Sequence, residues 1–137
     1  MKTVFSNKTF FYLLISFISL LLLWNIYTLV IGNIWSIIPI SVQVILLILI
    51  LSENQYAKKA ILIWVIIFLI VAPLLKLIAI ILGLINDAID KTKYEVNIRS
   101  LIYTVISLAI GILILDYTKR SVKVERPVTE KLEELQS

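Results

Sequence analysis

Cysteine and histidine are both absent from the 137-residue chain. Without cysteine, the chain can form no disulfide and offers no thiolate as nucleophile or metal ligand. Without histidine, it lacks the commonest general base and metal ligand near neutral pH. Glycine occurs only three times, and no glycine-rich loop is present to hold a phosphate group. We therefore expect no enzymatic activity, no cofactor, no metal site and no catalytic residue.

Charged residues are also scarce, at 16% of the chain, whereas 61% of the residues are hydrophobic. A soluble domain is roughly 25% charged and 45–50% apolar. The excess lies in four long blocks, at residues 10–31, 34–51, 61–85 and 98–118. A chain of this size cannot bury all four in its own interior, because it buries only about two-thirds of its surface on folding. A second apolar medium is needed, and a bilayer supplies one.

Each block contains 18 residues or more, enough for an α-helix to cross a hydrocarbon core of about 30 Å. The blocks are continuously apolar rather than alternating, which favours helices over the strands of a barrel. The sequence predicts an all-α integral membrane protein with four transmembrane helices in an antiparallel bundle. Residues 1–118 would form this domain, and residues 119–137 a charged cytoplasmic tail. Gly32-Asn33 predicts a tight hairpin between the first two helices, and Pro73 predicts a kink in the third.

The distribution of lysine and arginine predicts the orientation. With four spans, nine basic residues fall on the side of the two termini and the 52–59 connection, and three fall on the opposite side. Since basic residues accumulate in cytoplasmic loops, both termini should be cytoplasmic. Frequent isoleucine, lysine and asparagine favour a bacterial source, so the expected location is the bacterial cytoplasmic (inner) membrane.

Lys76 is the most unusual residue of the apolar blocks, since it is the sixteenth residue of the 25-residue third block. A charge at this depth is costly and usually marks function. By helical rise, Asn25, Tyr103 and Thr104 lie at about the same height, which predicts a polar cluster of these four residues. The alternative is that the Lys76 side chain only extends to the outer headgroups.

Two further features are candidates for contacts with other helices or partners. Small residues spaced by four, Ala79 with Gly83 and Ser107 with Gly111, are typical of close helix packing. In the tail, a short amphipathic helix starting at Pro127 would place three apolar residues on one face as a docking stripe: Val128, Leu132 and Leu135. The same stripe would also fit the surface of the inner leaflet.

These features predict an accessory, scaffold or immunity-type subunit that acts through contacts of its helices and tail. The alternative is a small homo-oligomeric channel, a transporter or a holin-like pore. Proton-coupled carriers generally need an acidic residue or histidine within a span, and none lies deep in these blocks. The expected partners are the lipid bilayer and a membrane protein or a second copy of the chain. No nucleic acid is expected, because the basic residues flank the apolar blocks rather than forming dense runs.

Overall fold

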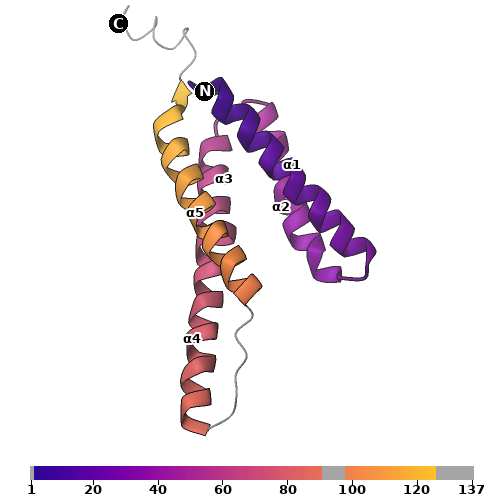
Figure 1. Ribbon diagram of the computed structural model, residues 1–137. Coiled ribbons are helices and arrows are strands. Elements are labelled where there is room, and N and C mark those ends of the chain that lie inside the picture. The colour runs from indigo at the N-terminus through magenta and orange to yellow at the C-terminus, as the bar shows by residue number, and fades with distance from the viewer. Residues whose placement is uncertain (1, 91–97, 126–137) are drawn as a thin grey trace, which may run out of the picture. The chain divides into compact units, whose positions relative to one another are not determined.

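The computed structural model of the protein describes residues 2–90 and 98–125 (Figure 1). The element order is β1 (Lys2–Phe5), α1 (Lys8–Val30), the short 3-10 helix η1 (Ile34–Ser36), α2 (Ile37–Leu51), α3 (Ala57–Trp64), the π-helix η2 (Val65–Val71), α4 (Ala72–Asp90), α5 (Ile98–Ser121) and β2 (Val122–Glu125).

The prediction of a mostly helical chain with four helices long and apolar enough to cross a bilayer is confirmed. The four helical stretches are Lys8–Val30, Ile34–Leu51, Ala57–Asn86 and Ile98–Ser121. Within the most apolar window of each, only 11–22% of the residues are buried. Most of the apolar side chains therefore lie on the surface of the protein rather than in a core.

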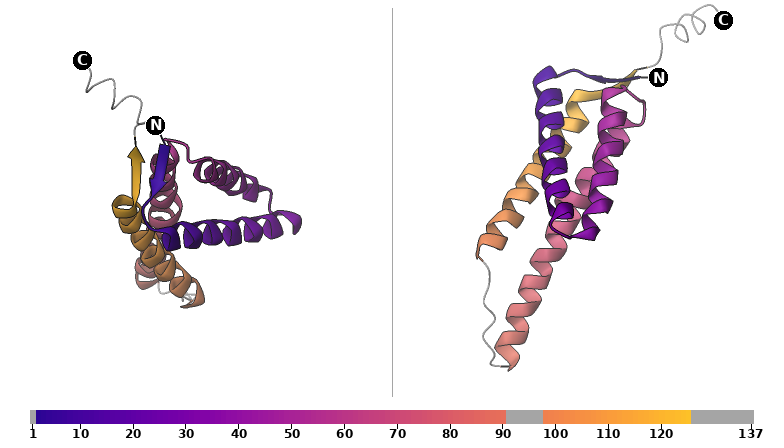
Figure 2. Two further views of the ribbon diagram at one scale, coloured as in Figure 1. Left: turned by 90° about the horizontal axis from the view of Figure 1, so that it is seen from above. Right: turned by 90° about the vertical axis from the view of Figure 1, so that its right-hand side faces the viewer.

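The chain divides into two compact units, Met1–Leu62 with Tyr117–Ser137, and Ile63–Asp116. In the first unit, α1 and α2 form a hairpin (Figure 2). Its packed interior includes four side chains that are at least 98% buried: Leu14, Ile18, Leu46 and Ile50. The predicted hairpin between the first two apolar blocks is therefore present.

The turn of this hairpin follows from Gly32, which has a φ angle of 101° that side-chain-bearing residues rarely adopt. The Gly32 amide donates to the Leu29 carbonyl at 3.0 Å, and the Asn33 amide donates to the Thr28 carbonyl at 3.0 Å. This pair of bonds is the Schellman motif, which satisfies carbonyls that a helix end leaves without donors. Pro39 then lies in the first turn of α2, where a missing amide hydrogen costs least.

The third apolar stretch is interrupted by the π-helix η2, which ends at Val71, just before Pro73. The Ala72 amide donates to the Ile67 carbonyl, five residues back instead of four. Proline provides no amide donor, and its ring crowds the carbonyl four residues earlier, which here is that of Leu69. A widened turn relieves such crowding, so the irregularity expected from Pro73 takes the form of a π-helical segment.

The two strands were not expected from the sequence. β1 and β2 pair antiparallel, with Thr3 opposite Val124 and Phe5 opposite Val122. The residues expected to begin the tail are therefore ordered here, as the last turn of α5 and then β2. The local signals are weak: both KTVF and VKVE contain β-branched residues, and only VKVE alternates apolar with polar residues.

Candidate functional site

The first candidate site is a clasp formed by β1, β2 and the turn residues Glu53 and Asn54, all in the first unit (Figure 1). β1 lies between the other two parts. One edge pairs with β2, and on the other edge the Thr3 amide donates to the Glu53 carbonyl at 2.9 Å. The clasp therefore joins three segments that are far apart in the sequence.

Thr3 holds the centre of the clasp, since its side chain is 99% buried. Its hydroxyl donates a hydrogen bond of 2.6 Å to the Asn54 carbonyl. Val122 on the opposing strand is completely buried as well. One apolar and one satisfied polar side chain thus fix the register of a sheet too short to be stable without such support.

The clasp also ties the beginning of α1 to the end of α5. The Ser6 amide donates to the Ser121 carbonyl at 2.8 Å, directly beyond the strand pairing. One turn further along, the rings of Phe10 and Tyr117 stack with their centroids 5.7 Å apart. The Asn7 side chain accepts from the Phe10 amide at 3.1 Å and so caps α1 at the clasp.

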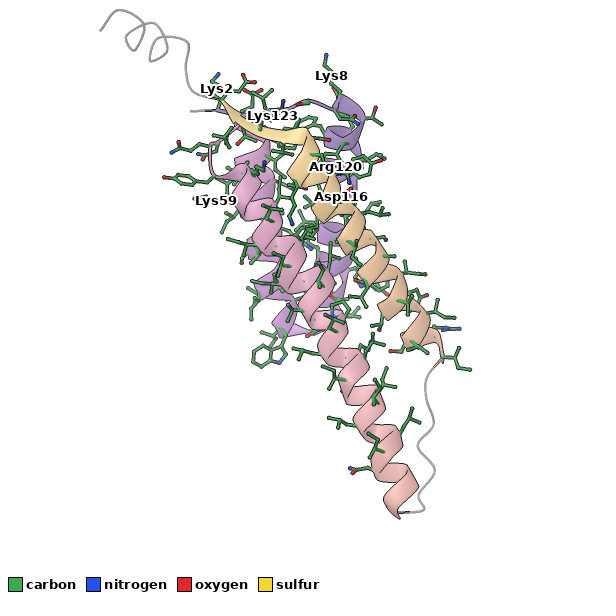
Figure 3. The ribbon with its side chains drawn as sticks, turned by 90° about the vertical axis from the view of Figure 1, so that its left-hand side faces the viewer. Lys2, Lys8, Lys59, Asp116, Arg120 and Lys123 are labelled. Carbon is green, nitrogen blue, oxygen red and sulfur yellow. The ribbon has the colours of Figure 1, made fainter. Side chains whose placement is uncertain are left out.

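The segments around the clasp are strongly basic. Residues 2–8, 52–62 and 117–125 hold seven basic and only two acidic side chains. Of the basic residues, Figure 3 labels Lys2, Lys8, Lys59, Arg120 and Lys123, which gather at one end of the first unit. The ion pair of Lys2 and Glu53, at 3.9 Å, is exposed on both sides and adds little stability. Lys2, Lys8, Lys59 and Lys123 are exposed, so much of this positive charge lies at the surface of the first unit.

A hollow of about 530 Å³ opens beside β2 in this basic region. Its lining combines Lys58 and Lys59 from α3 with the exposed Val124 side chain of β2 and the ring of Tyr56. Gln55 and Leu62 complete the lining. Two cations next to apolar surface suit an acidic, partly apolar group.

The second candidate site lies within the unit Ile63–Asp116. A cavity of about 270 Å³ is lined by residues of η2, α4 and α5: Phe68, Ala72, Pro73, Lys76, Tyr103, Thr104 and Ser107. We call it the Lys76 cavity. Three of the four residues predicted to cluster, namely Lys76, Tyr103 and Thr104, thus line one cavity.

The side chains of this cavity differ in their freedom to bind. The Thr104 hydroxyl is buried and donates to the Ser100 carbonyl at 2.8 Å, one turn back in α5. Tyr103 is 65% exposed at the rim. Among residues 2–90 and 98–125, Lys76 has no hydrogen-bond or ion-pair partner. The cavity lining therefore combines one lysine and three hydroxyl-bearing residues with apolar residues.

Asn25, the fourth residue of the predicted cluster, lies in the first unit. Its side-chain amide donates to the Gln43 side-chain oxygen at 3.1 Å. One turn along α1, the hydroxyls of Thr28 and Ser36 are 2.7 Å apart. These bonds form a polar seam between α1 and α2, which satisfies the side chains of Asn25 and Gln43 within the hairpin.

The predicted packing residues have different surroundings. A Cβ atom at Gly111 would lie 2.8 Å from the Leu69 Cβ and 2.9 Å from the Leu69 carbonyl oxygen, so α5 approaches η2 as closely as glycine permits. Ser107 lines the Lys76 cavity. Ala79 and Gly83 lie on α4, where Ala79 is exposed and Gly83 is half-buried. The predicted docking stripe of Val128, Leu132 and Leu135 lies outside the described residues.

The described residues contain no group of three or more cysteine, aspartate or glutamate side chains arranged to hold a metal ion. Comparison of the chain with protein families, with characterised proteins and with solved structures finds no match. The features of the protein that bear on function are the clasp, the Lys76 cavity and the exposed apolar helices.

Proposed function

We propose that this chain is an integral membrane protein of the bacterial cytoplasmic membrane, in which four helices cross the bilayer and the clasp lies on the cytoplasmic face. The observation that carries the proposal is the junction of β1, β2 and the turn at Glu53 and Asn54. A chain that crosses four times puts its two ends and its central connection on one side. The clasp unites these three segments.

Charge supports the cytoplasmic assignment of that side, because the clasp region carries seven basic against two acidic residues. The turn at Gly32-Asn33, between α1 and α2, carries no charge and belongs on the opposite side. Exposed leucine, isoleucine, valine and aromatic side chains along all four helices then face lipid, where their exposure costs nothing.

Within this orientation, we propose that the protein is an accessory or scaffold subunit that binds a partner through its clasp. The hollow beside β2 places Lys58 and Lys59 next to Val124. An acidic segment of a membrane-associated partner protein with an apolar anchor side chain fits this combination. Because the clasp holds the hollow in shape without a partner, binding would cost little ordering of the protein.

The orientation is tested by cysteine labelling, for which a chain without natural cysteine is well suited. Single substitutions Asn33→Cys, Ser52→Cys and Lys123→Cys are all at exposed positions. A maleimide that cannot cross the inner membrane should label Asn33→Cys in spheroplasts. It should label the other two variants only after the membrane is opened. Labelling of Ser52→Cys in sealed spheroplasts would refute the orientation.

The scaffold role is tested by placing a photo-crosslinking residue at Val124, with Ile34 at the far end of the hairpin as control. Val124 should give a discrete adduct that weakens when Lys58 and Lys59 are both changed to glutamate, whereas Ile34 should not give that adduct. A pore would instead release a trapped dye from liposomes that contain the purified protein. Dye release without the Val124 adduct would favour the pore over the scaffold.

A further inference from the structure

The charge of Lys76 has no counter-charge among the described residues, and the scaffold role does not explain this. Lys76 lines a cavity whose other polar residues carry hydroxyls, and it has no ionic partner in residues 2–90 or 98–125. Hydroxyls solvate a cation but do not neutralise it. A charge near hydrocarbon is expensive unless an anion accompanies it. An anion from outside the described residues would therefore lower the cost of the Lys76 charge.

The depth of Lys76 in the bilayer indicates from which leaflet such an anion would come; this step depends on the membrane orientation proposed above. Lys59 belongs to the cytoplasmic clasp region, and Lys76 follows it by about 25 Å of helix at 1.5 Å per residue. A hydrocarbon core is about 30 Å thick, so Lys76 lies just below the outer headgroups. Helical side chains lean towards the N-terminal end of their helix, which for Lys76 is the direction away from the outer headgroups.

Along η2 and α4 the lining of the cavity runs from apolar residues to Lys76, while Ser107 of α5 adds a hydroxyl-bearing residue further inward. Phe68 and Ala72 precede Lys76 by two turns and one turn, so they lie deeper in the bilayer. Tyr103 is close to the outer end of α5, which runs inward from Ile98. An amphiphile with its charged group towards the outer surface and its chain towards the midplane matches this order.

We propose that the Lys76 cavity binds the phosphate headgroup of an anionic phospholipid of the outer leaflet. The phosphate pairs with the Lys76 ammonium and accepts from the Tyr103 hydroxyl at the rim. The upper part of an acyl chain lies against Phe68 and Pro73. Free inorganic phosphate offers the same oxygen chemistry without the chain, and the experiment separates these two sources.

The test is native mass spectrometry of the full chain in mild detergent, with phosphatidylglycerol and phosphatidylcholine of identical acyl chains. The wild type should prefer phosphatidylglycerol. Lys76→Gln should lower that preference about tenfold, as expected for the loss of one charge-assisted pair. Lys76→Arg should retain the preference. The matched control Lys59→Gln removes an exposed cation outside the cavity and should change the preference less than twofold.

A second variant, Ser107→Leu, keeps the charge but puts a larger side chain at a half-buried residue of the cavity lining. It should weaken binding of both lipids. Millimolar inorganic phosphate should displace neither lipid. An unchanged preference in Lys76→Gln, an equal loss in Lys59→Gln, or displacement by inorganic phosphate would each overturn the lipid site.

Membrane extraction of the same variants separates this proposal from the orientation on which it depends. If Lys76→Gln resists alkaline extraction like the wild type and keeps its lipid preference, the lipid site alone is wrong. If the wild type is released by alkaline extraction, the membrane proposal fails and the lipid site fails with it.

Discussion

The Thr3 hydroxyl donates a hydrogen bond of 2.6 Å to the Asn54 carbonyl, fifty-one residues further along the chain. Thr3 is 99% buried, and its strand is paired on the other edge with β2. This single side chain thus links the turn between α2 and α3 to a sheet built from both ends of the described chain. The clasp depends on it more than on the exposed ion pair of Lys2 and Glu53.

Replacement of Thr3 by valine tests this bond while keeping the shape and the β-branched character of the residue. We expect a loss of about 1 kcal/mol in the free energy of unfolding, since one intramolecular hydrogen bond is removed. Thermal unfolding in detergent, followed by circular dichroism, measures the effect. Thr9→Val, at an exposed position in the first turn of α1, is the control and should change the stability little. Equal effects of the two substitutions would contradict the role of Thr3.

The bond between Asn25 and Gln43 should couple α1 and α2 energetically. A double-mutant cycle with Asn25→Leu and Gln43→Leu should give a coupling of about 0.6 kcal/mol, and at most about 1.7 kcal/mol, as for other hydrogen bonds between membrane helices. Unfolding by titration with a denaturing detergent gives the four stabilities required. Strictly additive effects of the two substitutions would show that the bond contributes nothing.

Gly111 tolerates no side chain, because an added Cβ would lie 2.8 Å from the Leu69 Cβ. Gly111→Ser should therefore destabilise the protein by about 1–3 kcal/mol, the usual cost of overpacking. Ala109→Ser introduces the same side chain at an exposed position of the same helix and serves as control. Thermal unfolding compares the two variants. A stability of Gly111→Ser equal to that of the control would show that α5 does not approach η2 so closely.

Thr118 offers a stabilising substitution. Its hydroxyl is completely buried and has no hydrogen-bond partner within the described part of the chain. Thr118→Val removes the unsatisfied group at nearly constant volume, so stability should rise by about 1 kcal/mol. A higher unfolding temperature in the same detergent assay is the expected result. A lower unfolding temperature would mean that the hydroxyl binds a water molecule or a polar partner in the native protein.

The helices could be predicted closely from the sequence, because the length and hydropathy of each apolar block and the turn at Gly32 are local properties. The expected blocks 10–31 and 34–51 differ from the observed stretches Lys8–Val30 and Ile34–Leu51 by at most two residues. The third stretch begins at Ala57, four residues before the expected start. Lys58 and Lys59 are good helix formers and join the first turn, although their charge ended the apolar block.

The clasp could not be predicted from the sequence, because strand pairing between distant segments has no local signature. KTVF and VKVE are each shorter than an average strand, and their pairing depends on where the helices bring them. The hydrogen bond of the Asn25 side chain shows a related limit. Helical rise gives the height of Asn25, but the rotation of α1 about its axis depends on packing, and in the structure Asn25 bonds Gln43.

The antiparallel pairing of β1 with β2 also implies an order of events during biosynthesis. β2 follows α5, so the ribosome finishes α1 to α5 before β1 can acquire its neighbour. Until then, the backbone amides and carbonyls on the edge of β1 that pairs with β2 have no strand to bond. Closure of this small sheet is accordingly a late step in maturation, because both strands are available only after α5 has been synthesised.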